Sequence, residues 1–245
     1  MKKVFNLICY ISLGVMILLI VNSFAGDLVF RMTYMTPKIT AMSGTVLNPK
    51  EFPTQINLPQ NEQEYIKIRT NKNKLYALKK QAEYSVTALV VAKNTNFFLR
   101  DVMRTPFDEV CLMDVGLVWG EIADKKYVKK HLRFQSTKTL GAARQLSVKS
   151  PDSQTMPYDW GYVSSHMGHT HIIPANRNVM SAMLSIKKHD VVKLDGYLVD
   201  IYNDKGDVVA LTSLSRSDKN STSRGYGACE DMYVTQVQIG NRIYR

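Results

Sequence analysis

The sequence predicts a mainly β fold with one or two short helices, a β-barrel of the oligonucleotide/oligosaccharide-binding (OB-like) or a related type, placed after an N-terminal transmembrane helix. Runs of β-branched residues separated by turn-forming segments occupy most of the chain from Glu83 onward. A long predicted strand is broken by Gly196, and one amphipathic helical pattern interrupts the strands. A strand that bends at a glycine and a single helix between strands are typical of small, partly open barrels.

The chain begins with an apolar segment that carries no charge. Lys2 and Lys3 precede an uncharged run over residues 4–25, which is as long as the roughly 20 residues that a membrane-spanning helix needs. By the positive-inside rule, the lysines predict that the rest of the chain lies outside the cytoplasm. We therefore expect residues 1–26 to be a signal-anchor in the inner (cytoplasmic) membrane, with a single pass and the C-terminal domain in the periplasm or outside. Cleavage after Ala25, at the end of a small-x-small triplet, is the alternative and would give a secreted or periplasmic protein.

The next segment, residues 27–62, is rich in proline and shows no clear helix or strand period. Prolines remove backbone donors and favour extended, polyproline-like chain. Those in this segment are Pro37, Pro49, Pro53 and Pro59. We expect an extended linker between the membrane and the domain, and an irregular arm packed on the domain is the alternative. Residues 63–245 are then long enough to bury the core of one extracytoplasmic β-rich domain.

The first clear strands of this domain are expected over residues 84–92, before the turn-prone residues 93–96, and over the β-like run 109–120. A short helix follows later, and Asn176 or Asn178 can cap it. Its apolar residues recur at i, i+3 and i+4 spacing and are Val179, Met180, Met183 and Leu184. Methionines in such a pattern are expected to fill the core rather than to bind metal.

The long strand over residues 190–202 is expected to change its buried face at Gly196. One face carries Val192, Leu194 and Leu198, and the other carries Val199 and Ile201. A turn over residues 203–207 leads into a strand over 208–215, and residues 232–239 form the last strand. The residues expected on the buried side of this last strand are Tyr233, Thr235, Val237 and Ile239.

The net charge of +11 is concentrated in two basic runs. The first comprises Lys67, Arg69, Lys72, Lys74, Lys79 and Lys80, and the second comprises Lys125, Lys126, Lys129, Lys130, His131 and Arg133. Outside the cytoplasm, such surfaces attract anionic envelope components such as phospholipid head groups. A nucleic-acid ligand is not expected, because no aromatic residues interleave with the lysines. Ordinary solvated faces are the alternative interpretation of both runs.

Two cysteines lie outside the leader, Cys111 and Cys229, and an even number is typical of a compartment where disulfides persist. We expect a disulfide between them, which in the chain-entropy model would stabilise the domain by about 4–5 kcal/mol. The competing interpretation is a catalytic thiolate at Cys229, activated by a histidine.

Three histidines, His166, His169 and His171, lie close together in the sequence. In a β conformation His169 and His171 project to the same face and can supply two nitrogen ligands to one zinc or copper ion. His166 can join them only if Gly168 makes a turn. No H-E-x-x-H motif or cysteine pair accompanies them, and loop histidines that merely hydrogen-bond are commoner. The sequence therefore favours a protein without a cofactor, with zinc as the alternative.

Two further groups of residues are candidates for partner binding. Residues 215–230 form a long polar loop in which Arg216 and Arg224 can bind a carboxylate or phosphate, with internal ion pairs as the alternative. Tyr158 and Trp160 can stack on a sugar ring or a base, and a core anchor is the alternative role of the tryptophan.

Short motifs follow one another in a recognisable order in the C-terminal half. They are Val118-Trp119-Gly120, His171-Ile172-Ile173-Pro174, Gly196-Tyr197-Leu198, Ser215-Arg216-Ser217-Asp218 and Gly227-Ala228-Cys229-Glu230. Through them, roughly residues 84–239 resemble a group of uncharacterised proteobacterial proteins that are single-pass or periplasmic. The chain differs from the group by an insertion around residues 220–226. The resemblance implies no activity, but both cysteines match positions in the group, which favours the disulfide.

These features favour a non-enzymatic, membrane-anchored extracytoplasmic domain that binds a partner protein or an anionic envelope component. The alternative is a metal-assisted hydrolase or nuclease that acts on an envelope or extracellular polymer through His169 and His171. The sequence contains no nucleophile-elbow motif, no paired carboxylates beside an aromatic cleft and no complete set of metal ligands. An enzymatic role is therefore the less favoured interpretation.

Overall fold

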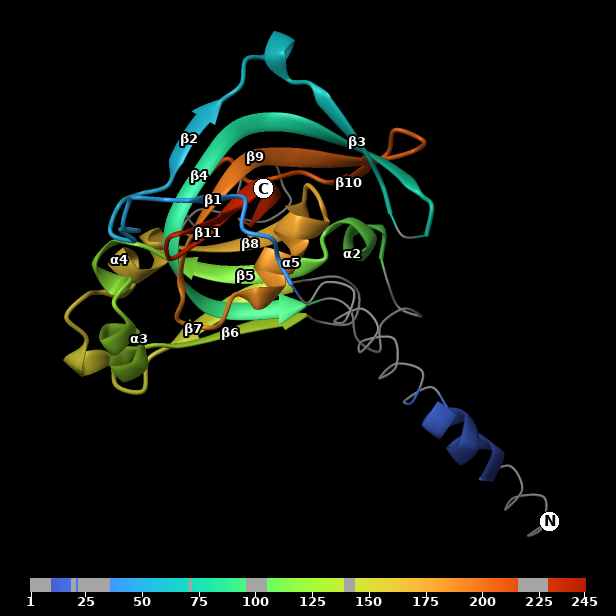
Figure 1. The fold of residues 1–245 in the computed structure, drawn as a ribbon. Coiled ribbons are helices and arrows are strands. Elements are labelled where there is room, and N and C mark those ends of the chain that lie inside the picture. Colours follow the sequence, from blue (N-terminus) through green and yellow to red (C-terminus); the bar gives the residue numbers. More distant parts are fainter. Residues whose placement is uncertain are drawn as a thin grey trace.

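The computed structural model describes residues 10–18, 21, 36–70, 72–95, 105–138, 144–215 and 229–245. These residues are mainly β, as predicted, and the described strands form one ten-stranded sheet and a separate two-stranded hairpin (Figure 1). Residues 10–18 are helical, but most of the predicted transmembrane segment lies outside the described residues. Within the described ranges, no helix combines the length and the apolar character that crossing a bilayer requires.

The elements follow one another in an order that places most helices between strands. The first part of the chain forms β1 (Ala41–Met42), β2 (Thr54–Asn57), η1 (Gln60–Glu62), β3 (Tyr65–Arg69) and β4 (Leu75–Thr95). The middle part forms α2 (Pro106–Val110), β5 (Met113–Val118), η3 (Gly120–Ile122), α3 (Lys125–His131), β6 (Arg133–Lys138), β7 (Arg144–Lys149), η4 (Ser153–Thr155) and α4 (Trp160–Ser165). The last part forms β8 (Met167–Pro174), α5 (Arg177–Ser185), β9 (Val191–Asn203), β10 (Val208–Ala210), β11 (Glu230–Ile239) and β12 (Arg242–Tyr244).

Five strands of the sheet pair in a closed ring, in the order β4, β5, β8, β11, β9 and back to β4. All of these pairs are antiparallel except β8 with β11, which is parallel. The main hydrophobic core fills the inside of the ring and includes Val115, Ile172, Leu194 and Met232. Helix α5 packs on this core through Val179 and Met183, as its sequence spacing predicted. Asn176 caps the helix, because its side-chain oxygen accepts a hydrogen bond from the Val179 backbone at 3.0 Å.

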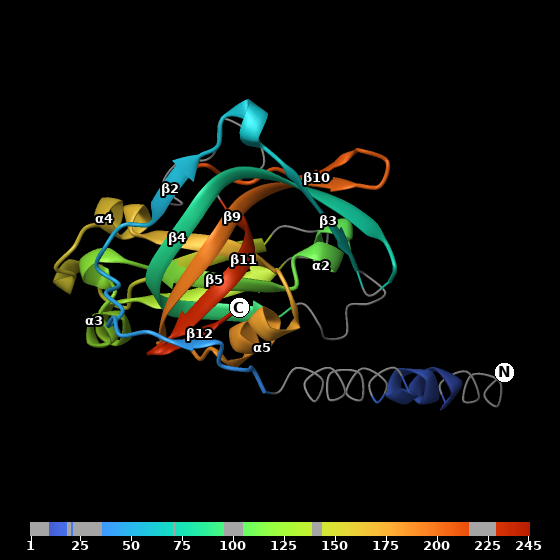
Figure 2. The ribbon, with the colours of Figure 1, turned by 45° about the horizontal axis from the view of Figure 1, so that its top comes forward.

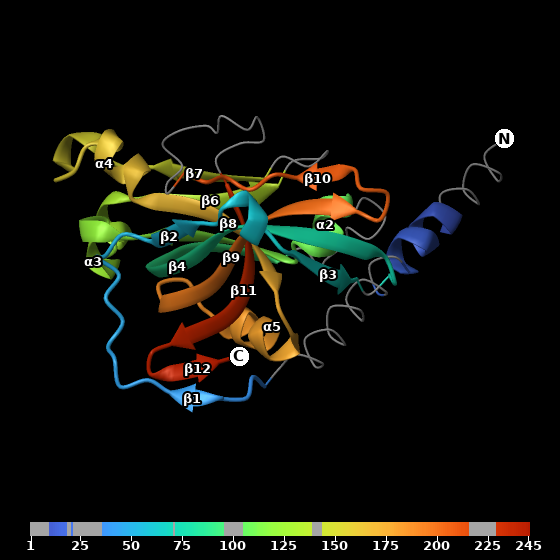
Figure 3. The same ribbon diagram turned by 90° about the horizontal axis from the view of Figure 1, so that it is seen from above.

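The described part of segment 27–62 lies on the sheet. Strand β1 pairs with β12 on one side of the ring, and β2 pairs with β4. Figures 2 and 3 show this N-terminal stretch, drawn in light blue, running along the domain before it enters β2. Residues 36–62, which contain the four prolines, therefore form an arm that packs on the domain.

The buried face of β9 changes between Leu198 and Val199, shortly after Gly196, and each face carries the residues that the sequence predicted. Val192, Leu194 and Leu198 belong to the core inside the ring, whereas Val199 and Ile201 belong to a second cluster on the other side of the strand. The turn after β9 is also as predicted. The Asn203 backbone amide bonds to the Asp207 carbonyl at 3.0 Å, and Gly206 adopts a positive φ of 85°.

The prediction for the buried face of the last strand is wrong in its first half. Met232 and Val234 face the ring interior, and Val237 takes over after a register shift against β9 between Val234 and Gln236. Such a bulge places an extra residue in one strand and exchanges its two faces, so strict alternation assigned Tyr233 and Thr235 to the wrong side.

Two other predicted strands are shorter than expected. The β-like run 109–120 forms strand only over β5, because Pro106 and a capping box between Thr105 and Asp108 begin helix α2, which includes Glu109 and Val110. The strand expected over residues 208–215 is limited to β10, and residues 211–215 continue without regular structure.

A second layer covers the outer face of β4, β5 and β8. The hairpin of β6 and β7 lies across these strands, and Figure 3 shows it on the opposite side of the ring from β1 and β12. Gly116 on β5 permits the close approach, since a Cβ at this position would lie 2.7 Å from the Leu146 side chain on β7. The space between this hairpin, α2 and the outer face of the ring holds the buried polar residues described below.

Candidate functional site

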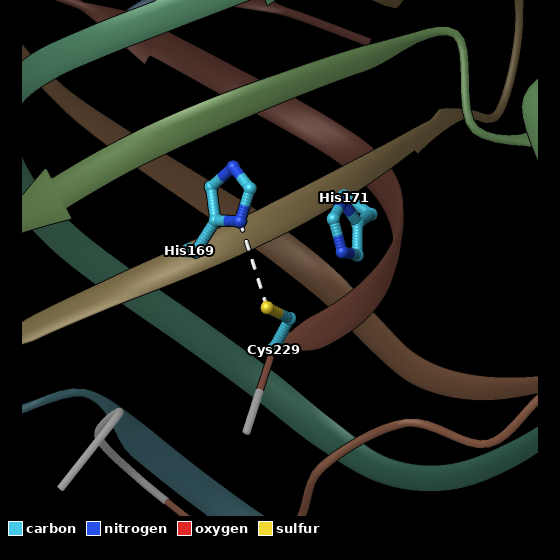
Figure 4. A group of neighbouring side chains, drawn as sticks. All are labelled: His169, His171 and Cys229. Atoms are coloured by element: carbon cyan, nitrogen blue, oxygen red, sulfur yellow. Dashed lines mark hydrogen bonds between the residues drawn. The ribbon is translucent and has the colours of Figure 1, made fainter. Parts of the chain in front are cut away.

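His169, His171 and Cys229 come together on the outer face of the ring (Figure 4). The two histidines project from the same side of β8, as predicted, and Cys229 lies immediately before β11, the parallel neighbour of β8. One donor atom from each of the three side chains lies within 4.8 Å of the other two. Two imidazoles and a thiol that converge in this way can bind a metal ion or form a cysteine–histidine pair.

His169 is completely buried and makes a contact through each ring nitrogen. Its Nδ1 lies 3.5 Å from Cys229 Sγ, and its Nε2 lies 3.3 Å from the Ser136 hydroxyl on β6. Burial, reinforced by the nearby His171, lowers the pKa of His169 to about 3. The imidazole is therefore neutral at physiological pH.

His171 is held by a buried carboxylate. Its Nδ1 lies 2.7 Å from Asp114 Oδ1, and the Phe107 ring meets the imidazole edge-on with centroids 5.0 Å apart. Burial would raise the pKa of Asp114, but the hydrogen bond to His171 and the positive charge of Arg144 together lower it. The bond fixes the ring orientation and leaves Nε2 of His171 as its ligand atom.

Arg144 connects this carboxylate to helix α2. Its guanidinium donates to Asp114 at 2.6 Å, to Asp108 and to the Cys111 carbonyl at 3.2 Å, and it stacks over Phe107 at 4.5 Å. Arg144, Asp108 and Asp114 have side chains that are almost fully buried. The ion pair thereby ties the hairpin, α2 and β5 together beside the two histidines.

A third carboxyl group, Asp231, lies next to His171 in the paired register of β8 and β11. It is buried, and burial raises its pKa to about 7. Its backbone amide donates to the Thr212 hydroxyl at 3.0 Å, which joins β11 to the segment after β10.

Cys111 and Cys229 are not joined in a disulfide, contrary to the prediction. Strand β8 lies between them. Leu112, next to Cys111, donates to the Ile172 carbonyl on one side of β8, and Glu230, next to Cys229, pairs with Thr170 on the other side. Two strand spacings amount to roughly 9–10 Å, beyond the about 7 Å between Cα atoms that a disulfide tolerates. Cys111 instead packs in the cluster between α2 and β9, where burial raises the pKa of its thiol well above the usual value.

The other predicted site residues lie elsewhere. His166 stacks on Tyr162 with ring centroids 3.8 Å apart, and its Nδ1 lies 2.8 Å from the Tyr162 carbonyl, away from the His169 and His171 pair. Tyr158 stacks on the other face of Tyr162 at 4.8 Å, and Trp160 is 43% exposed at the start of α4. Arg216 and Arg224 lie outside the described residues.

Sequence reasoning missed Ser136, Asp114, Arg144 and Asp231. A usable signal existed for Asp114, because it is the one charged residue in the apolar run from Val110 to Val118. A charge within a strand that is buried on both faces needs a partner. No comparable signal marks Ser136 or Arg144, since the β6–β7 hairpin has the polar composition of a surface hairpin.

The chain matches no protein-family model, and comparisons with the curated proteins and with the solved structures gave no match.

Proposed function

We propose that this chain is a metal-binding domain in which His169, His171 and Cys229 hold a zinc-class divalent ion. The observation that carries the proposal is the convergence of the three donors, with the other nitrogen of each histidine held by Ser136 or Asp114. Histidine ligands in metal sites commonly donate their second ring N–H to a carboxylate or another polar group, which fixes the ring for the metal. The His171 and Asp114 pair has this arrangement.

The donor distances suit a small ion. Around tetrahedral zinc, with Zn–N bonds of about 2.0–2.1 Å and a Zn–S bond of about 2.3 Å, donor atoms lie roughly 3.3–3.7 Å apart. The 3.5 Å between Cys229 Sγ and His169 Nδ1 falls in this range. The widest separation in the group, up to 4.8 Å, needs an inward movement of about 1 Å. Two imidazoles and one thiolate favour zinc or copper over magnesium or calcium.

Three protein donors leave the fourth position of a tetrahedral ion open, as in hydrolytic zinc sites. The metal-assisted hydrolase of an envelope or extracellular polymer is therefore the enzymatic form of this proposal. We infer that its scaffold is an OB-like barrel that carries the site on its outer face. The closed ring of five strands, with α5 between β8 and β9, supports that assignment. An anchor within residues 1–26 would hold the domain outside the cytoplasm.

The test is the metal content and zinc affinity of untagged protein purified without chelator. We expect about one zinc ion per chain by elemental analysis, or stoichiometric uptake in a zinc titration. His169→Ala, His171→Ala and Cys229→Ser should each abolish this uptake, because each removes a donor. Asp114→Asn should weaken it by about 10- to 100-fold, the usual effect of losing an outer-shell partner.

Two variants provide matched controls for this experiment. His166→Ala removes a neighbouring histidine, and Cys111→Ala removes the other cysteine of the domain, without touching the three donors. Both should keep full zinc binding. A protein that takes up no zinc, or that loses it equally in His166→Ala and His169→Ala, would refute the metal site.

A second candidate function is non-enzymatic binding of an anionic envelope component or of a partner protein that carries one. The observation that favours it is a continuous series of aromatic rings in contact at the α3 and α4 end of the domain. The rings are Phe52, His166, Tyr162, Tyr158 and Tyr127, with centroid distances of 3.8 to 5.4 Å between neighbours. Phe52 is 54% exposed, and α3 presents four exposed lysines beside Tyr127: Lys125, Lys126, Lys129 and Lys130.

Such a surface fits an acidic polysaccharide, because the rings can stack on sugars while the lysines meet its carboxylates. We expect the protein to bind an acidic polysaccharide more tightly than a neutral one in an affinity assay. Phe52→Ala should weaken this binding by about twofold to tenfold, the contribution of one aromatic contact. Val208→Ala, an exposed apolar residue on β10, should leave it unchanged. Equal retention of acidic and neutral polymers would exclude this function.

A further inference from the structure

A cleft of about 340 Å³ lies between β3, α2 and the ends of β8 and β11. The residues that line it include three with cationic side chains, Lys67, Arg69 and Lys72, and an apolar group that includes Val110, Ile173 and Tyr233. The volume is at the lower end of the about 300–1,000 Å³ that small-molecule sites occupy.

The charge inside the cleft is unbalanced. Glu109 is the one carboxylate in the lining, and it already accepts hydrogen bonds from Lys74 at 3.0 Å and from the Tyr76 hydroxyl at 3.0 Å. Lys72 approaches the same carboxylate at 3.9 Å. Within the described part of the chain, Lys67 and Arg69 form no salt bridge, and the Arg69 guanidinium donates to the carbonyl and side-chain oxygens of Asn73 at 3.2 and 2.9 Å. The cleft therefore has an excess of positive charge, which favours an anion.

Uncharged donors are present on the same wall. The Thr70 hydroxyl is buried and has no hydrogen-bond partner among the described residues. Strand β3 pairs only with β4 among the described strands, so backbone groups along its other edge are not used by a second strand. Buried polar groups are normally satisfied, so a hydroxyl of this kind indicates a place for a ligand atom or water.

The opposite wall is apolar. Val110 and Ile173 are buried in the cluster between α2 and β9, and the Tyr233 ring is partly buried against it. Ile173 and Tyr233 are paired across β8 and β11, so their side chains lie on the same face. The cleft thus offers a cationic edge on β3 and an apolar surface on β8, β11 and α2.

We propose that this cleft binds an amphipathic organic anion, with a phosphate or carboxylate group at Lys67, Arg69 and Thr70 and a short hydrocarbon chain against Ile173 and Tyr233. This inference does not depend on the metal site, since none of its residues is a metal donor. The ligand chemistry is shared by lipid head groups with a short chain and by soluble phosphate esters. The probes below distinguish these two sources.

The experiment is calorimetric titration of the metal-free protein with alkyl phosphates of increasing chain length. Octyl phosphate should bind, whereas inorganic phosphate and octanol should each bind at least tenfold more weakly, because each supplies half of the interactions. From butyl to octyl phosphate, affinity should rise by up to about fourfold for each buried methylene. Vesicles that contain anionic phospholipid should compete with octyl phosphate if the natural source is a membrane lipid, and should not compete if it is a soluble ester.

A pair of double variants with the same change in charge provides the control. Lys67→Glu with Arg69→Glu should reduce octyl phosphate binding by at least tenfold. Lys187→Glu with Lys188→Glu, which alters two exposed lysines after α5, should change it by less than twofold. Ile173→Ala should remove the dependence on chain length while inorganic phosphate binding stays unchanged. Equal losses in the two double variants, or octyl phosphate binding no tighter than inorganic phosphate, would overturn the proposal.

Discussion

Replacing Gly196 with alanine should destabilise the domain by at least about 3 kcal/mol, toward the upper end of the cost of overpacking a core. A Cβ at this position would overlap the carbonyl oxygen of Tyr233 on β11. The obstacle is backbone, which cannot rotate away as a side chain can. Gly196 is also paired with Tyr84 on β4, so β9 is fixed on both sides at the point of overlap. The free energy of unfolding in urea, followed by circular dichroism, measures the effect.

Gly44→Ala is the matched control, because a Cβ at Gly44 would meet no atom within 4 Å. This variant should change the free energy of unfolding by no more than about 0.5 kcal/mol, as expected for a surface substitution. A Gly196→Ala protein as stable as Gly44→Ala would mean that β9 does not pair with both β4 and β11 at this residue. The closed ring of strands would then be wrong.

The sequence predicted correctly the features that depend only on the residue pattern of a single strand or helix. The exchange of buried faces on β9 is visible because the apolar residues up to Leu198 occupy even positions, whereas Val199 and Ile201 occupy odd positions. The same-face placement of His169 and His171 follows from their spacing on one strand. The faces of β11 were not predictable in this way, because the shift after Val234 depends on pairing with β9 rather than on the local pattern.

The third donor of the candidate metal site depends on topology. Cys229 reaches His169 because β8 and β11 are parallel neighbours, although 60 residues separate the two side chains. An even number of cysteines in a domain expected outside the cytoplasm predicts a disulfide instead, and no local pattern indicates that β8 separates the two thiols. Helix α2 was a different kind of error. Its capping box at Thr105 and Asp108 was present in the sequence but overlooked beside a β-like run.

The ion pair around Arg144 is expected to produce the other large effect on stability. Arg144→Met keeps an apolar stem that can pack on Phe107 but removes the positive charge between Asp108 and Asp114. Two buried carboxylates are then left without their common partner, and breaking a buried ion pair from one side costs about 3–5 kcal/mol. Urea unfolding near pH 8 should show a loss of this size. Lys149→Met, an exposed lysine on the same strand, should change the free energy of unfolding by no more than about 0.5 kcal/mol.

The pH dependence of this loss separates electrostatics from packing. Without Arg144, the pKa of Asp114 in the folded protein should be higher than in the native protein, because burial is then opposed mainly by His171. A carboxyl group with a raised folded-state pKa binds more protons in the folded state, so stability decreases as the pH rises through that interval. The deficit of Arg144→Met relative to the native protein should therefore be smaller near pH 5 than near pH 8. A deficit that is the same at both pH values would indicate that Arg144 acts through packing on Phe107, and the electrostatic role assigned to this residue would have to be abandoned.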